Sequence, residues 1–140
     1  MISSFRGKYN FLSNFYECML HYNGLRFCSL EAAYQASKLE NEEDRVYFST
    51  LSAKDSKKEI KKYKIRKDWN KVKFSIMANL LCIKFSNPIL KNKLLDTGDE
   101  ELIEGNNWGD TVWGVCNGEG DNMLGKLLMK TREYYRNVEE

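Results

Sequence analysis

The sequence of 140 residues holds only one histidine, His21, one proline and four widely separated cysteines. With one histidine and no CxxC pair, a dedicated zinc or haem site is not expected. The four cysteines, at positions 18, 28, 82 and 116, are best interpreted as reduced thiols, most of them buried. This usage of cysteine is typical of a cytoplasmic protein, and we predict neither a metal nor a cofactor.

The chain also lacks a long apolar run. No stretch approaches about 18 consecutive apolar residues, and Met1–Asn10 does not have the pattern of a signal peptide, so no membrane partner is expected. No linker rich in serine, glycine or proline interrupts the chain, and it shows no repeat. Because 42% of its residues are hydrophobic and 13% aromatic, we predict a single compact domain over residues 1–140.

Local patterns predict a helix-rich α+β fold with a few short strands. Asn23-Gly24 lies between two apolar runs and predicts a hairpin over Met19–Phe27. The predicted helices begin near Leu30 and then span Glu42–Leu51, Ala53–Lys62, Trp69–Phe85, Ile89–Leu95 and Met123–Arg136. Their predicted N-caps are Ser29, Asp68, Asn87 and Asn122. Short strands are expected at Ile2–Phe5, Leu102-Ile103 and Thr111–Cys116, and a loop over Asn10–Tyr16.

Positive charge is concentrated in one segment. Lys54–Lys73 contains ten Lys or Arg against three Asp or Glu, a net charge of +7 in a chain whose total is +2. Asp96–Asp110 contains six acids and no base. This asymmetry suits a substrate with phosphate groups or a nucleic acid. A lysine-rich helix face that serves solubility is the alternative.

The segment Ser29–Lys38, SLEAAYQASK, places polar residues where a helix usually carries aliphatic ones. Glu31, Tyr34, Gln35 and Lys38 follow the i, i+3, i+4 and i+7 spacing of one helix face. Their chemistry, with an acid, a phenol, an amide and an amine, is that of one wall of a site. A solvated polar face is the alternative interpretation.

A second unusual segment is Glu104–Trp113, EGNNWGDTVW. It combines two acids, two amides and two tryptophans in a stretch that resembles a turn. Indole rings can stack on a flat polar ring while amides form hydrogen bonds with it, so a binding loop is predicted. A structural loop held in place by buried tryptophans is the alternative.

The stretch Gly120–Lys126, GDNMLGK, matches the start of a phosphate-binding loop. The next residue is Leu127, where that motif needs Ser or Thr for magnesium, so a nucleoside triphosphatase is not expected. A glycine turn followed by a helix is the better interpretation.

Seven segments in this order resemble the NADAR family, which includes the YbiA-like proteins. They are FLSNFY (Phe11–Tyr16), SLEAAYQASK (Ser29–Lys38), DW (Asp68-Trp69), KF (Lys84-Phe85), LLDTGD (Leu94–Asp99), LIEGNNWGDTVWG (Leu102–Gly114) and GDNMLGKLLMKTR (Gly120–Arg132). The resemblance covers nearly the whole chain and implies the family's α+β fold. It also implies N-glycoside hydrolysis: some members act on phosphorylated ribosylamino-pyrimidine intermediates of riboflavin synthesis, and others remove ADP-ribose from guanine in nucleic acid.

The resemblance assigns roles to matching positions. Catalysis is expected from Glu31 as acid and base, from Lys38 as nucleophile or charged contact, and from Asp110. Substrate binding is expected from Ser13, Asn14, Phe15, Tyr34, Gln35, Trp69, Glu104, Asn107, Trp108, Trp113 and Asn122. The chain has Ala32 where members often have histidine, and its EGNNWGD loop lacks the shorter proline-containing form of the riboflavin-linked members. These departures favour an ADP-ribosyl substrate over a riboflavin intermediate. A non-catalytic module that binds ADP-ribose, and a nucleic-acid binder that uses Lys54–Lys73, are the rival interpretations.

Overall fold

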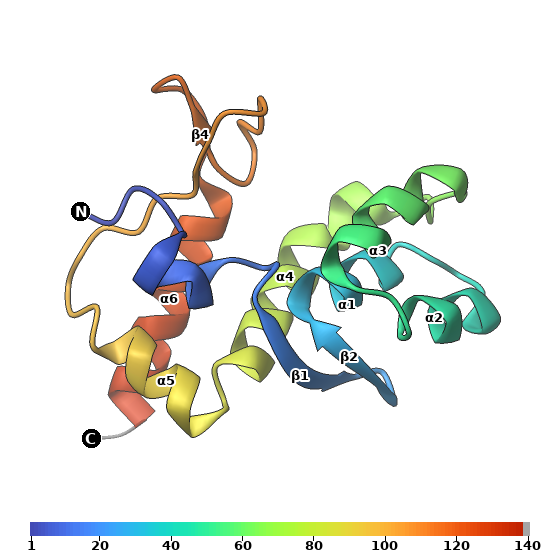
Figure 1. Cartoon of the computed structure of the whole chain (residues 1–140), viewed down its shortest axis with the longest axis horizontal. Coiled ribbons are helices and arrows are strands. Elements are labelled where there is room, and N and C mark those ends of the chain that lie inside the picture. Colours follow the sequence, from blue (N-terminus) through green and yellow to red (C-terminus); the bar gives the residue numbers. More distant parts are fainter. Residues whose placement is uncertain (139–140) are drawn as a thin grey trace. The chain divides into compact units, whose positions relative to one another are not determined.

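The computed structural model describes residues 1–138 and confirms the helix-rich α+β class (Figure 1). The residues group into two compact units. The middle unit is Asn14–Lys84, and the terminal unit combines Met1–Ser13 with the chain from Phe85 onward. The single domain over residues 1–140 stays a prediction, and its residues 139 and 140 lie outside the described residues.

The middle unit begins with the predicted hairpin, which is confirmed. Strand β1 (Glu17–Tyr22) pairs antiparallel with β2 (Leu25–Ser29), and the pairing is irregular between Glu17 and Leu20. The turn residues Asn23 and Gly24 have φ values of 52° and 78°. Asparagine and glycine tolerate this left-handed conformation, which a tight two-residue hairpin turn requires.

Helix α1 (Leu30–Ala36) follows the hairpin directly and is the element around which the middle unit packs. The hydroxyl of Ser29 accepts a hydrogen bond from the Ala32 N–H at 3.1 Å, as the predicted N-cap requires. Helix α1 contacts both strands and α2 (Glu42–Phe48), α3 (Ala53–Glu59) and α4 (Trp69–Lys84), which can be followed in Figure 1. The apolar core of this unit includes Leu20, Phe27, Leu30, Phe48, Met77, Leu80 and Leu81.

Three details of the middle unit differ from the sequence-based expectation. Helix α2 ends at Phe48, and the last turn predicted for α3 is a separate 3-10 helix, η2 (Ile60–Lys62). The carboxylate of Asp68, predicted to cap α4, accepts two hydrogen bonds from the Arg66 guanidinium, at 2.6 and 2.9 Å. A guanidinium binds both carboxylate oxygens in one plane, and this charge-assisted pair competes with capping.

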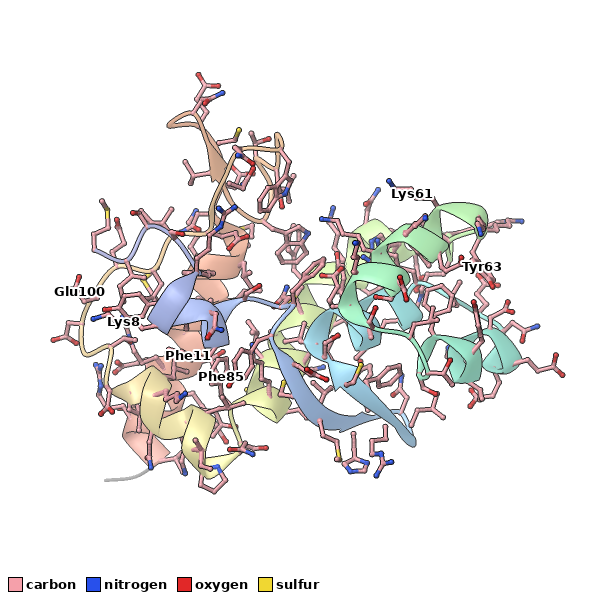
Figure 2. The ribbon with its side chains drawn as sticks, viewed as in Figure 1. Lys8, Phe11, Lys61, Tyr63, Phe85 and Glu100 are labelled. Carbon is pink, nitrogen blue, oxygen red and sulfur yellow. The ribbon has the colours of Figure 1, made fainter. Side chains whose placement is uncertain are left out.

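The terminal unit is built on two helices, α5 (Pro88–Leu95) and α6 (Met123–Val138), which pack together. Asn87 caps α5 through hydrogen bonds from the Ile89 and Leu90 N–H groups at 2.9 and 3.2 Å, as predicted. The rings of Phe11, in the 3-10 helix η1 (Gly7–Leu12), and Phe85 meet edge to face with centroids 6.5 Å apart (Figure 2). The core also includes Leu12, Leu90, Leu94, Leu102, Leu124 and Leu128.

The strands predicted in the terminal unit are shorter than expected. Ile2 and Leu102 form one parallel bridge, where two strands were predicted. Only Val115–Cys116 of the predicted strand Thr111–Cys116 is extended, as β4, and it pairs parallel with β3 (Gly105–Asn106). The N–H groups of Val112 and Trp113 donate to the Asp110 carboxylate instead. This turn occupies the backbone donors that a longer strand would need. Likewise, η1 occupies the first half of the predicted loop Asn10–Tyr16.

The predicted cap of α6, Asn122, has a different role. Its backbone is left-handed, with φ of 52°. Its side-chain oxygen accepts from the Glu104 N–H and its amide donates to the Leu102 carbonyl, both at 2.9 Å. A Cβ at Gly125 would collide with this amide and with the Leu102 carbonyl oxygen. Asn122 therefore fastens the segment before the EGNNWGD loop to the start of α6.

Replacing Asn122 with glycine should lower the free energy of unfolding by roughly 1–3 kcal/mol. Glycine accepts the positive φ, so the loss reports on the two buried hydrogen bonds and not on backbone strain. Urea unfolding measures the change. Asn117→Gly is the matched control, because Asn117 has φ of 53° but is exposed. Equal losses in the two variants would contradict this role of Asn122.

Candidate active site

The polar face of α1 is buried. Glu31, Tyr34 and Gln35 are 7%, 6% and 4% exposed. The alternative of a solvated face is therefore wrong, because water does not reach these groups as it reaches an ordinary surface helix. Burying a carboxylate and an amide is costly unless they have partners, so such a cluster within a core marks a candidate site.

Glu31 is held from two sides. Its backbone N–H donates to the Asn14 carbonyl oxygen at 3.0 Å. Its carboxylate oxygen Oε2 accepts a hydrogen bond from Gln35 Nε2 at 2.6 Å. Glu31 also lies in the first turn of α1, where the partial positive charge of a helix N-terminus favours a carboxylate. The sequence spacing thus places an oriented carboxylate in the core, next to an amide four residues later.

Lys38 follows the end of α1, and its ammonium group lies against two aromatic rings. The Lys38 nitrogen is 5.2 Å from the Tyr34 ring centroid and 5.6 Å from that of Trp69. These two rings meet edge to face at 5.2 Å. Burial lowers the pKa of Lys38, the negative charge of Glu31 opposes that effect, and the positive charges of Lys57 and Lys73 reinforce it. Lys38 is therefore easier to deprotonate than an ordinary lysine.

The basic run is divided among several elements, and two of its members act on the site. Lys57, on α3, lies 5.5 Å from the ring centroid of Phe15, and Lys73 is on α4. Both influence Lys38 electrostatically. Lys61 is exposed and extends from the surface of its unit (Figure 2). A subset of the lysines thus faces α1, while others remain available at the surface.

Lys84 is a buried cation that the sequence reasoning did not assign to the site. It is 2% exposed at the end of α4, and its nitrogen is 5.6 Å from the Tyr16 ring centroid. Burial lowers the pKa of Lys84 from 10.5 to about 8, and the nearby Cys18 partly opposes this shift. The signal was present in the sequence, since Lys84 follows the buried Leu80 and Leu81 at i+4 and i+3 on the same apolar stripe.

The loop Glu104–Trp113 lies in the terminal unit and is organised by side chains. The Asn106 amide donates to the Asp110 carbonyl at 2.8 Å, and its oxygen accepts from the Asp110 N–H at 3.0 Å. Asp110 Oδ1 accepts from the Val112 and Trp113 N–H groups at 3.1 and 2.9 Å. The loop therefore depends on Asn106 and Asp110, and not on buried tryptophans as the structural alternative supposed. Asn106 was missed in favour of its neighbour Asn107.

The other predicted site residues of the terminal unit have different exposures. Asn107 and Trp108 are exposed, Trp108 by 54%, while Glu104 and Trp113 are half-buried. Asn122 is occupied by the two backbone contacts described above. Ser13 follows the end of η1, and its N–H donates to the Asn10 carbonyl.

In the middle unit, Asn14 and Trp69 are half-buried, and Phe15 is 43% exposed.

The predicted residues thus form two groups, one in each unit. Glu31, Tyr34, Gln35, Lys38 and Trp69 are brought together around α1. Glu104, Asp110, Trp113 and Asn122 belong to the loop of the terminal unit. The substrate contacts predicted for both groups, and the catalytic role predicted for Asp110, stay predictions.

Between residues 1 and 138 no group of three or more His, Cys, Asp or Glu side chains is arranged to hold a metal ion. Within the same residues, no helix has the length and apolar character to cross a membrane. The four cysteines are free thiols, but the expectation that most are buried is wrong, since Cys28 is exposed and the other three are half-buried.

A buried carboxylate oriented by an amide, together with an amine of lowered pKa that lies against two aromatic rings, is suited to acid–base chemistry on a ring-bearing substrate. Comparison with known proteins agrees with the family resemblance. The family model described as "NADAR domain" matches residues 3–136. The chain belongs to the NADAR family.

The similar proteins include enzymes of two descriptions. An N-glycosidase from Nostoc punctiforme is 33% identical over 138 residues, which cover 93% of this chain and 88% of the relative. A riboflavin biosynthesis protein from Vibrio vulnificus is 35% identical over 133 residues, and the match covers 89% of this chain but 35% of that protein. The NMR structure of the E. coli protein YbiA has a TM-score of 0.86 at 29% identity, over 99% of this chain and 84% of that one. The predicted fold and family are confirmed.

Replacing Lys84 with methionine should change how stability depends on pH. Below pH about 8 the amine is protonated in both the folded and unfolded protein, and between about 8 and 10.5 only the unfolded chain keeps the proton. The natural protein therefore gains stability as pH rises through this interval, by up to about 3 kcal/mol. The advantage of Lys84→Met over the natural protein should be largest at pH 7 and should shrink towards pH 10.

Urea unfolding of both proteins across this pH range measures the difference. Burial raises the pKa of Cys18, which lowers stability at high pH. Cys18 is present in both proteins, so its effect largely cancels in the difference. Lys71→Met, on an exposed position of the same helix, controls for the loss of a positive charge. A stability difference between the two proteins that does not vary with pH would contradict the lowered pKa of Lys84.

Proposed function

We propose that the protein is an N-glycosidase that hydrolyses a C1′–N bond of a ribosyl compound. The observation that carries the proposal is the buried Glu31 carboxylate, oriented by Gln35, on the helix that also carries Tyr34, whose ring lies against the amine of Lys38. Membership of the NADAR family and relatives named N-glycosidase support the same reaction class.

In the proposed reaction, Glu31 transfers the proton. Cleavage of the C1′–N bond leaves its electron pair on the departing base and develops positive charge on the ribose ring. A carboxylic acid can protonate the leaving nitrogen, and the resulting carboxylate then stabilises the cation or activates water. The hydrogen bond from Gln35 keeps Oε2 in position, so that the other carboxylate oxygen is oriented as well.

Lys38 is proposed as the nucleophile. Its lowered pKa increases the fraction of neutral amine, which is the form that attacks carbon. Attack at C1′ expels the base, and opening of the ribose ring with loss of a proton from nitrogen forms a Schiff base. Water then adds to the C=N bond, and release of the sugar aldehyde returns the amine. None of these reaction steps needs an oxidant, a reductant or a metal.

The substrate that we favour is ADP-ribosylated guanine in nucleic acid. Lys57 and Lys73, both near Lys38, would neutralise the diphosphate, and the exposed lysines of the basic run would contact a nucleic-acid backbone. The alternative substrate is a phosphorylated ribosylamino-pyrimidine of riboflavin synthesis. The relative from Vibrio vulnificus, named a riboflavin biosynthesis protein, supports that alternative. A cytoplasmic location is proposed with either substrate.

Replacing Glu31 with glutamine should lower the rate of hydrolysis by roughly 10²–10⁴-fold, because glutamine cannot transfer the proton. The natural protein and the variant are incubated with ADP-ribosylated guanine in DNA, and separately with a ribosylamino-pyrimidine phosphate. Mass spectrometry follows the released products. Glu40→Gln is the control, since Glu40 is exposed. Full turnover by Glu31→Gln would rule out its acid–base role. If the natural protein binds ADP-ribose but hydrolyses neither compound, it is a binding module.

Reduction with cyanoborohydride during turnover should attach the sugar covalently to the natural protein and not to Lys38→Arg. Arginine keeps the positive charge but cannot form the Schiff base. The rate should also rise with pH at a lower pH than for an ordinary lysine, because the neutral amine is the reactive form. Intact-protein mass and a pH–rate profile provide the two readouts. An active Lys38→Arg without an adduct on the natural protein would identify Lys38 as a charged contact.

A further inference from the structure

Two side-chain oxygens near Glu31 are buried and have no hydrogen-bond donor among residues 1–138. They are Oε1 of Gln35 and Oδ1 of Asn14. Both residues contact Glu31, since Gln35 donates to its carboxylate and the Asn14 carbonyl accepts from its N–H. The two acceptors therefore belong to the residues that hold the proposed catalytic acid.

The orientation of the Gln35 amide is well determined by its contacts. Its nitrogen donates to Glu31 Oε2 at 2.6 Å. Rotating the amide by half a turn would place its oxygen against the carboxylate oxygen, and two acceptors at that distance repel each other. Oε1 must therefore point away from Glu31. The Asn14 nitrogen lies 3.7 Å from the Met77 sulfur, which leaves its oxygen as the second open acceptor.

A buried acceptor without a donor is unusual in a folded protein. It costs roughly a factor of 5 to 150 in an equilibrium constant, and most buried polar atoms are paired. Gln35 is 4% exposed, so bulk water does not satisfy it. Two such oxygens, on residues that both bond to Glu31, are suited to a ligand that offers hydrogen-bond donors.

The two amide oxygens are hydrogen-bond acceptors, and this restricts which groups of a bound ligand can lie beside them. An ionised phosphate is an acceptor and would be repelled by two amide oxygens and the Glu31 carboxylate. Hydroxyl groups on neighbouring carbons are suitable donors. A phosphate group of the substrate is better placed near Lys57 and Lys73, whose positive charges lower the pKa of Lys38.

We propose that Gln35 and Asn14 recognise the vicinal hydroxyl groups of the substrate ribose, and so make the site selective for ribosyl over 2′-deoxyribosyl compounds. This proposal rests on the proposed function and specifies which part of the substrate the face of α1 receives. A site built around hydroxyl donors rejects an analogue that lacks one, because a buried acceptor is then left without a partner. The natural protein should bind ribose 5-phosphate at least about tenfold more tightly than 2-deoxyribose 5-phosphate.

Isothermal titration with these two sugar phosphates tests the proposal. In Gln35→Met the preference for ribose should fall to about threefold or less, even where the lost hydrogen bond to Glu31 weakens binding of both sugars. A residue that only supports Glu31 would weaken both sugars alike. Asn14→Ser is the second variant, because it tests the other oxygen if Gln35→Met does not fold. Circular dichroism establishes that each variant is folded.

Equal affinity of the natural protein for the two sugars, or no binding of ribose 5-phosphate at millimolar concentration, would overturn the proposal. The same holds if both variants retain the full preference for ribose. These outcomes are separate from the hydrolysis assay. A protein that prefers ribose but cleaves no C1′–N bond would keep this inference and lose the proposed reaction. A protein that cleaves the bond without preferring ribose would do the reverse.

Discussion

The hydrogen bond between the Gln35 amide and the buried Glu31 carboxylate is the interaction on which the candidate site depends. Burying a carboxylate costs free energy unless hydrogen-bond donors meet its oxygens, and a donor in the wrong position would not offset that cost. Helix α1 satisfies the requirement within itself, through residues four positions apart. Because α1 also contacts the hairpin and three other helices, the packing of the middle unit fixes where this carboxylate lies.

The lysines of this protein show how one residue type acquires different properties from its surroundings. Lys61 is an ordinary exposed charge, Lys38 is half-buried against two aromatic rings, and Lys84 is almost completely buried. Desolvation disfavours the ammonium form, and burial lowers the pKa of both Lys38 and Lys84. Burial thus converts two members of a basic chain into amines that can lose a proton nearer neutral pH.

The EGNNWGD loop uses a different strategy, in which polar side chains supplement the short pairing of β3 with β4. Asn106 and Asp110 occupy the backbone groups of the loop, and Asn122 fastens the preceding residues to α6. Such contacts hold a loop that has only a two-residue strand pairing and leave its tip exposed. Trp108 and Asn107 are consequently exposed at the surface.

The sequence alone determined the local elements with strong signals: the Asn23-Gly24 hairpin, the Ser29 and Asn87 caps, and the polar spacing of Glu31, Tyr34 and Gln35. These depend on interactions between residues a few positions apart, which a sequence displays directly. Burial, by contrast, depends on residues far apart in the chain. Only the tertiary structure showed that the Glu31 face is enclosed, that Lys84 is buried, and that Asn122 bonds to Leu102 and Glu104 instead of capping α6. The strand predicted at Thr111–Cys116 formed only at Val115–Cys116 for a local reason, because the Asp110 carboxylate accepts hydrogen bonds from the Val112 and Trp113 N–H groups.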